Sequence, residues 1–220
     1  MRRTFYLFFL LYFNLGLASA QNYRWGITAG LDINKVAGDC IESDGMRIGS
    51  QLGLRAEYDF SGKQTGLYLT SGLNWSQKGM KSAVWLGLPK EDGTIDEGRF
   101  YNTLTINFLE MPVSVGCKFG RTSKFKFLVE GGPRFSLAAW SKETYYRNDK
   151  KIGSNSNAID RNNLRHFDMG IGANVGILYN KHFQFIVGYD HGLLNMAKPY
   201  AGYSSTYRNR SIITSISYMF

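Results

Sequence analysis

The stretch RIGSQLGLRAEYDF, residues 47–60, alternates between two kinds of side chain. The largely apolar set consists of Ile48, Leu52, Leu54, Ala56, Tyr58 and Phe60. The polar or glycine set consists of Arg47, Gly49, Gln51, Gly53, Arg55, Glu57 and Asp59. Because successive side chains of a strand point to opposite faces, this period of two predicts a β-strand with one apolar and one polar face.

The same alternation recurs along the chain. Further strands are predicted near residues 25–34, 67–78, 103–119, 125–137, 166–179, 183–190 and 212–220. The predicted connections alternate between short turns (61–63, 120–124 and 180–182) and long polar loops (36–46, 79–102, 141–163 and 194–206). This layout predicts an all-β fold, an eight-stranded antiparallel up-and-down transmembrane β-barrel.

The segment 103–119 changes phase once. Leu104, Ile106 and Phe108 occupy even positions, whereas the apolar residues from Leu109 onward occupy odd positions. A one-residue change of phase indicates a β-bulge. We therefore expect a bulge next to Phe108, with the apolar side chains before and after it on the same outer face and Glu110 pointing inward.

Composition excludes several other classes of protein. The chain has 220 residues, 25 Gly, 15% aromatic residues, two Cys and a net charge of +9. A mean hydropathy of −0.25 excludes a bundle of membrane helices. Two cysteines exclude a disulfide scaffold and a zinc site built from four thiolates. We expect no metal site and no cofactor.

The N-terminus has the pattern of a secretory signal peptide. A basic pair precedes an apolar run, and Ala18-Ser19-Ala20 supplies small residues for cleavage. The run is shorter than the roughly 18–20 apolar residues that a spanning helix needs. We therefore expect a signal peptide over residues 1–20 and one barrel domain over residues 21–220.

Alternation alone does not decide whether the apolar face contacts lipid, because a soluble barrel alternates with its apolar face inward. Charges of both signs and many glycines on the polar face favour a packed, polar interior. Aromatic residues also gather in two belts at the strand ends, as at the two membrane interfaces. The belts consist of Trp25, Tyr58, Phe60, Phe119, Phe125, Tyr179, Phe183, Tyr218 and Phe220 at the short-turn rim, and of Trp75, Tyr101, Trp140, Phe167 and Tyr207 at the other.

These patterns predict a protein of the Gram-negative outer membrane with both termini in the periplasm. Its expected partners are outer-membrane lipid, lipopolysaccharide and the barrel assembly machinery, with no nucleic acid. The predicted lumen network consists of Arg55, Glu57, Glu110, Lys126, Glu130, Arg134 and Asp168. The predicted C-terminal assembly strand carries Ile216, Tyr218 and Phe220 on one face.

Histidine, aspartate and serine residues near the long-loop rim suggest a catalytic site. His166 with Asp168 lies near Ser136 and Ser141 in the predicted layout, and a His–carboxylate pair beside a hydroxyl can support acyl transfer. The alternative is a polar network that fills the lumen. We expect the latter, with no catalytic residues and no enzymatic activity.

A basic stretch beside this rim has two interpretations. It consists of Lys142, Arg147, Lys150, Lys151, Arg161 and Arg165. Such cations can bind lipopolysaccharide phosphates through charge-assisted hydrogen bonds, or they can belong to a solvated loop.

Three motifs resemble the PorT-type outer-membrane β-barrel domain of the Bacteroidetes. They are Phe108–Pro112 (FLEMP), Gly188–Met196 (GYDHGLLNM) and Asn209–Phe220. Asp190-His191 departs from the Ser-Tyr of that family. The resemblance implies a link to protein secretion, with secretion-system proteins as partners, since the name-giving member assists protein secretion. Our leading hypothesis is a non-enzymatic accessory, anchor or assembly component. The alternatives are a narrow outer-membrane pore and a rim-located enzyme that modifies lipid.

Overall fold

The computed structural model describes residues 22–38, 45–61, 65–82, 84–89, 93–120, 124–199 and 206–220. The predicted signal peptide, residues 1–20, lies outside this set. The strands are β1 (Tyr23–Ala37), β2 (Arg47–Asp59), β3 (Gly66–Lys81), β4 (Trp85–Pro89), β5 (Ile95–Phe119), β6 (Phe125–Arg147), β7 (Lys150–Ser156), β8 (Phe167–Tyr179), β9 (Phe183–Gly192) and β10 (Arg208–Met219). A four-residue helix, α2 (Ala158–Arg161), follows β7. Among the described residues, no helix is long and apolar enough to cross a membrane.

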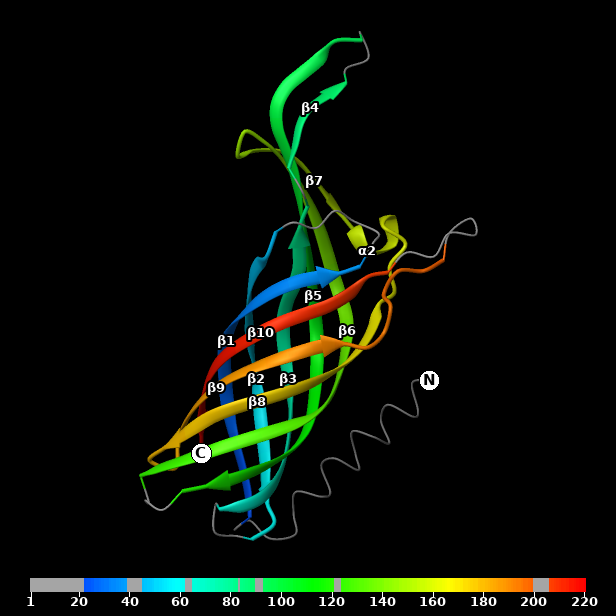
Figure 1. The fold of residues 1–220 in the computed structure, drawn as a ribbon. Coiled ribbons are helices and arrows are strands. Elements are labelled where there is room, and N and C mark those ends of the chain that lie inside the picture. Colours follow the sequence, from blue (N-terminus) through cyan, green and yellow to red (C-terminus); the bar gives the residue numbers. More distant parts are fainter. Residues whose placement is uncertain are drawn as a thin grey trace.

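Eight strands in the described part of the chain close into a ring. Their order is β1-β2-β3-β5-β6-β8-β9-β10, and β10 pairs again with β1; every pair is antiparallel. Figure 1 shows these strands as a closed, tilted barrel with the C-terminus at the lower end, which we call the turn end. The opposite end is the mouth end. The prediction of an eight-stranded antiparallel barrel is confirmed.

The exterior of the ring is apolar. Along β10, exposed Ile212, Ile216 and Tyr218 alternate with buried Ser211 and Ser217. The same arrangement recurs on the other strands, so that aliphatic and aromatic side chains cover the outside. At the turn end aromatic rings pack in neighbouring pairs, as for Trp25 and Phe220, whose ring centroids lie 4.3 Å apart. This orientation is the predicted one.

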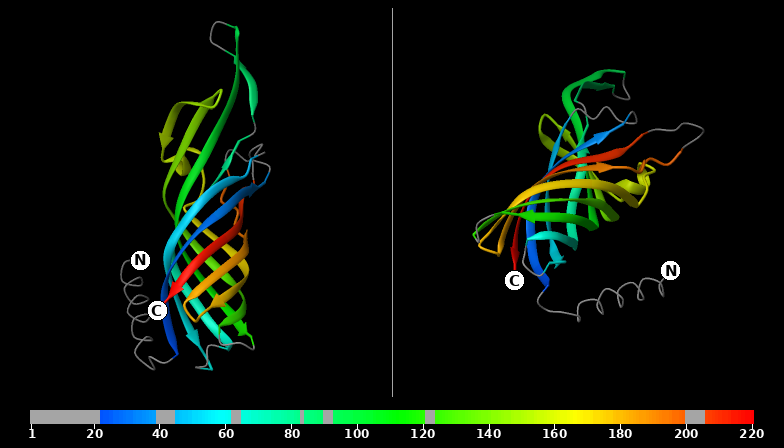
Figure 2. Two further views of the ribbon diagram at one scale, coloured as in Figure 1. Left: turned by 90° about the vertical axis from the view of Figure 1, so that its left-hand side faces the viewer. Right: turned by 60° about the horizontal axis from the view of Figure 1, so that its bottom comes forward.

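Two predicted loops are largely strand instead. β5 extends to Ile95 and β6 to Arg147, and their paired ends continue into hairpins with β4 and β7. Figure 2 shows these strands projecting well beyond the rest of the barrel. Threonine and tyrosine in these stretches favour strands. The prediction depended on alternation of apolar and polar residues, which a strand outside the membrane does not require. We call β4, residues 95–106, residues 141–147 and β7 the outer sheet.

A bulge lies at the predicted level, next to Phe108, but its extra residue is on the neighbouring strand β6, and the even-numbered apolar residues of β5 face the lumen and not the lipid. Ile106 and Phe108 are fully buried inside the barrel, on the same face as Glu110. The pairing of β5 with β3 keeps one register throughout. The bulge lies on β6, where Ala139 is the extra residue between Trp140 and Ala138. The inward face of β5 is therefore continuous. Its side chains change from apolar near the mouth end to charged nearer the turn end.

These inward apolar residues belong to a cluster that fills the mouth end, which we call the mouth cluster. It consists of Val36, Met80, Leu104, Ile106, Phe108, Ala138, Ala158, Ile159, Leu164, Met196, Ala197 and Tyr207. A bridge between Leu164 and Ala197 holds the segments after α2 and β9 together over the barrel. Tyr207, which was predicted to belong to the outer aromatic belt, is fully buried here because it precedes β10 and folds inward.

Candidate functional site

The lumen near the turn end holds a network of buried ion pairs. The guanidinium of Arg55 contacts Glu130 at 2.6 Å and Glu57 at 3.0 Å. The Nζ of Lys118 contacts Glu57 at 2.5 Å and Asp59 at 3.2 Å. These residues come from β2, β5 and β6, so the network ties together strands on different sides of the ring. Burial of charge is tolerated here because each charge has a partner of opposite sign.

Neutral side chains complete the bonding of the two glutamates. Glu130 accepts hydrogen bonds from the hydroxyl of Tyr68 and the amide of Asn174, each at 2.9 Å. Glu57 accepts one from the amide of Gln184 at 2.8 Å. Gly116 makes room for the tyrosine ring, because a Cβ at that position would lie 2.5 Å from it.

A second group of ion pairs lies nearer the mouth. Glu110 contacts Nζ of Lys78 at 2.6 Å and the guanidinium of Arg134 at 3.4 Å, and it accepts a hydrogen bond from the hydroxyl of Ser136 at 3.0 Å. Arg134 also forms an ion pair with Asp190. Glu110, which belongs to the FLEMP motif, is therefore the acidic residue that joins this group together.

A cavity of about 60 Å³, lined by polar and apolar side chains, lies between the two groups. Arg55 and Glu130 line it from the turn end and Arg134 lines it from the mouth end. A water molecule needs roughly 10–15 Å³ of such volume, so the cavity accommodates a few water molecules. The interior thus consists of two ion-paired layers with a small cavity between them, beneath the apolar mouth cluster.

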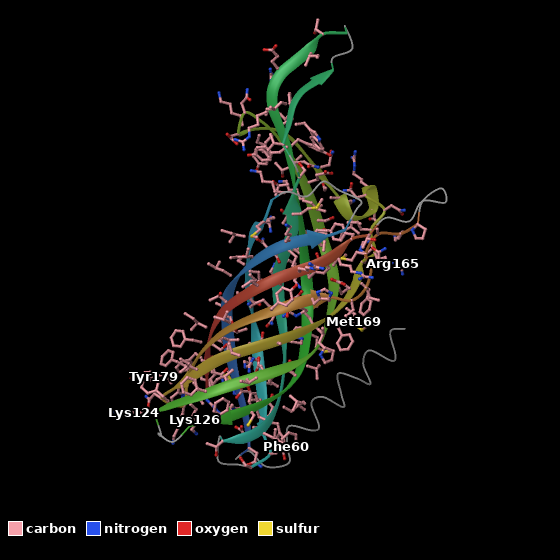
Figure 3. All side chains as sticks on the ribbon, in the orientation of Figure 1. Phe60, Lys124, Lys126, Arg165, Met169 and Tyr179 are labelled. Atoms are coloured by element: carbon pink, nitrogen blue, oxygen red, sulfur yellow. The ribbon has the colours of Figure 1, made fainter. Side chains whose placement is uncertain are left out.

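The predicted network residues are divided among these layers. Arg55, Glu57 and Glu130 lie in the turn-end group, and Glu110 and Arg134 lie in the mouth-end group. The remaining two lie beside these groups. Asp168 is the ladder partner of Ser136, lines a small cavity with Lys78 and Arg134, and accepts a hydrogen bond from Asn209 at 2.7 Å. Lys126 lies at the turn end, beside the labelled Lys124 and Tyr179 in Figure 3.

Four further charged residues of the network were not predicted: Asp59, Lys78, Lys118 and Asp190. All four occupy inward positions by parity, which is the signal that could have found them.

The residues considered for a catalytic site do not form a nucleophile–base arrangement: Ser136 and Asp168 are ladder partners, but the His166 side chain lies elsewhere. His166 lies 2.9 Å from Asp160 on α2, and both side chains are at least half exposed. Ser136 donates to Glu110, whereas the hydroxyl of Ser141 accepts the backbone N–H of Ile159 at 2.9 Å. In the described part of the chain, no three His, Cys, Asp or Glu residues are grouped as metal ligands.

The predicted basic stretch does not form one patch. The guanidinium of Arg147 lies over the ring of Phe100 on the inner face of the outer sheet. Arg161 belongs to α2, and Figure 3 labels Arg165 at the mouth end. Lys142 and Lys151 lie on the outer face of the sheet, because their ladder partners there, Thr105 and Tyr146, alternate with inward-facing neighbours.

A closed ring with an apolar exterior, aromatic residues at its rims and an ion-paired interior defines a transmembrane β-barrel. The chain belongs to the family described as outer membrane protein beta-barrel domain, which matches residues 19–198. Membership implies an outer-membrane location, but the match does not single out the PorT-type group.

Comparison with curated proteins gave no match. Among solved structures, the neisserial surface protein NspA is 12% identical with a TM-score of 0.45, covering 89% of this chain and 97% of that chain. The attachment invasion locus protein Ail of Yersinia pestis, in complex with the heparin analogue sucrose octasulfate, is 12% identical with a TM-score of 0.41, covering 90% of this chain and 99% of that chain.

Proposed function

We propose that this protein is a non-enzymatic anchor in the outer membrane. Its closed barrel fixes the outer sheet outside the cell, where the sheet docks another component of the cell surface. Both termini face the periplasm in this proposal, because the short turns and the C-terminus share one end of the barrel. The PorT-type resemblance favours protein secretion as the process, with secretion-system proteins as partners.

The main observation behind this proposal is that two layers, one of ion pairs and one of apolar side chains, close the interior of the barrel. Ion pairs fill the lumen from Lys118 to Glu110, and the mouth cluster covers it with apolar side chains such as Phe108. An open channel through this barrel requires both layers to separate, which breaks buried charge pairs at a high cost in free energy. The geometry therefore supports an anchor better than a narrow pore.

The rim residues support the absence of enzymatic activity. His166 and Ser141 contact Asp160 and Ile159 on α2, whereas Ser136 donates to Glu110 on β5, so each of the three has a structural partner. A rim-located enzyme that modifies lipid needs a nucleophile and a base within hydrogen-bond reach of each other. The outward row Ile216, Tyr218 and Phe220 at the C-terminus is the part that we propose the barrel assembly machinery recognises.

Planar-bilayer recording with the purified protein tests the closed barrel. We expect no steady ion current from the folded wild-type protein, and a steady current would overturn closure and favour the pore. A pull-down from native outer membranes tests the docking role. We expect secretion or other surface components to copurify, whereas recovery of the barrel alone would contradict docking.

A further inference from the structure

The outer face of the outer sheet carries a regular set of hydroxyl and lysine side chains. Thr103 and Thr105 alternate with buried Leu104 and Ile106, so they point away from the mouth cluster. Residues opposite each other in a ladder share a face, which places their partners on the same side. We call this set the hydroxyl–lysine face; it consists of Lys81, Thr103, Thr105, Lys142, Thr144 and Lys151.

The part of this face nearest the membrane carries only positive charges. The acidic residue of the same stretch, Glu143, points to the opposite face, where it accepts hydrogen bonds from Asn102, Tyr145 and Asn162. Among the described residues, neither Lys142 nor Lys151 forms an ion pair. Asp149, in the turn between β6 and β7, accepts a hydrogen bond from Tyr101 at 3.1 Å and lies 3.8 Å from Arg99, so a carboxylate adjoins the end of the face that is farther from the membrane. The two rows nearer the membrane, Thr105 with Lys142 and Thr103 with Lys81 and Thr144, offer cations and hydroxyl groups without a carboxylate.

The position of the face relative to the membrane follows from two tryptophans. Trp75 and Trp140 point outward at the mouth end, with ring centroids 4.4 Å apart, and tryptophan favours the membrane–water interface. Lys142 and its ladder partner Thr105 lie two residues beyond Trp140, which is about 7 Å along a strand. The first row of the face therefore lies at the level of the lipid headgroups, and the next row, with Lys81, lies beyond it.

Aromatic rings continue the face away from the membrane. Tyr101 and Tyr146 stack with ring centroids 4.8 Å apart and planes 12° apart. The Nζ of Lys81 lies 3.9 Å from the centre of the Tyr101 ring. A flat aromatic pair beside hydroxyls and cations suits a ligand that has both sugar rings and anionic groups.

We propose that the hydroxyl–lysine face binds the phosphorylated sugar headgroups of lipopolysaccharide in the outer leaflet. The lysines bind phosphate through charge-assisted hydrogen bonds, the threonines bind sugar hydroxyls, and the tyrosine pair packs against a sugar ring. This inference rests on the proposed function, in which the outer sheet faces the outside of the cell, and it names one ligand of that sheet.

A binding measurement in zwitterionic detergent micelles tests this proposal. The probe is fluorescently labelled rough-type lipopolysaccharide, titrated with the purified full-length protein and followed by anisotropy. We expect the variant Lys142→Glu/Lys151→Glu to bind at least about tenfold more weakly, because it replaces two charged hydrogen-bond donors with repelling carboxylates. The matched control is Lys124→Glu/Lys181→Glu, which makes the same charge change at the turn end and is expected to bind as the wild type does.

Two further binding measurements identify which part of the ligand is recognised. Dephosphorylated lipopolysaccharide is expected to bind at least about tenfold more weakly than the intact form, and inorganic phosphate at an equal concentration is expected not to displace it. Equal affinities of the two double variants, equal binding of the dephosphorylated form, displacement by inorganic phosphate, or no binding by the wild type would each overturn the proposal. Heat-modifiable gel mobility verifies that every variant is folded. A failure here leaves the conductance and pull-down results, and hence the anchor, unaffected.

Discussion

The Nζ of Lys118 lies 2.5 Å from Oε2 of Glu57, and neither side chain is exposed. The pair connects β5 with β2, which are separated in the ring by β3. Two residues far apart in the sequence thus form a strut inside the lumen that bridges the intervening strand β3. Such a strut opposes flattening of the barrel, and its strength can be measured by removing one charge.

Replacement of Glu57 by Gln is expected to lower the free energy of unfolding by about 3 kcal/mol. The substitution keeps the shape of the side chain but leaves the buried ammonium of Lys118 with Asp59 as its remaining acidic contact. Urea-induced unfolding in lipid vesicles, followed by tryptophan fluorescence, measures the change. Glu97→Gln on the exposed outer sheet is the control and is expected to change stability by less than about 0.5 kcal/mol. Similar shifts for both variants would contradict the strut.

The orientation of β5 shows a feature that the sequence alone does not determine, namely which face of an alternating strand points to lipid. Alternation identified the strand and its level in the barrel, but it could not tell lipid from an apolar interior. Leu104 and Phe108 were predicted to face lipid because apolar residues had done so on every other strand. They face inward because the mouth cluster needs apolar partners for α2 and the segment after β9, and those contacts arise only when the chain is folded.

Adjacent substitutions on β5 test this orientation. Ile106→Lys is expected to lower the free energy of unfolding by about 4 kcal/mol or more, because it places a second buried cation opposite Lys78, its ladder partner, at the mouth cluster. Thr105→Lys, one residue away, is expected to cost less than about 0.5 kcal/mol because its side chain points outward at the level of the lipid headgroups, where a lysine can reach water. The comparison uses the same unfolding assay in detergent-free vesicles. If the order of the two effects were reversed, the inward assignment of Ile106 would be wrong.

The lipid-facing surface makes a separate prediction. Leu54 lies between Ile27 and Leu73 in the ladder, so it sits among aliphatic residues on the outside of the ring. Leu54→Arg is expected to cost about 2–4 kcal/mol, the penalty for a cation near the bilayer midplane. Leu86→Arg on β4 makes the same exchange at a position that is 85% exposed and beyond the membrane. We expect it to leave the unfolding midpoint in vesicles nearly unchanged; an equal loss would mean that β4 also contacts lipid.

The candidate site was predictable in part. Parity identified inward charges such as Arg55 and Glu130, because every second side chain of a barrel strand faces the lumen. Parity did not identify their partners, because ring curvature and strand register decide which inward charges meet. Lys118 and Glu57 meet across an intervening strand, a relationship that no local spacing contains. The outer sheet was missed for a related reason: its strands pair with each other beyond the membrane, where alternation of apolar and polar residues is not required.

Close packing around Gly116 provides a last test of the lumen. Gly116 lies opposite Tyr68 in the ladder, and a Cβ there would lie 2.5 Å from the tyrosine ring. The ring cannot move away freely, because its hydroxyl donates to Glu130 and the Nζ of Lys118 lies 4.2 Å from its centre. Gly116→Ala is therefore expected to cost about 1–3 kcal/mol through overpacking.

Gly153 on β7 is the matched control for this substitution. A Cβ at Gly153 would meet no atom within 4 Å, and alanine restricts the unfolded chain more than glycine does. Gly153→Ala is therefore expected to be neutral or to stabilise by up to about 0.5 kcal/mol. Combining Gly116→Ala with Tyr68→Leu removes the ring that the new methyl group meets, so the cost of the alanine should largely disappear in that background. If the alanine costs the same with and without the ring, the strain lies in the backbone of β5 and not in the contact with Tyr68.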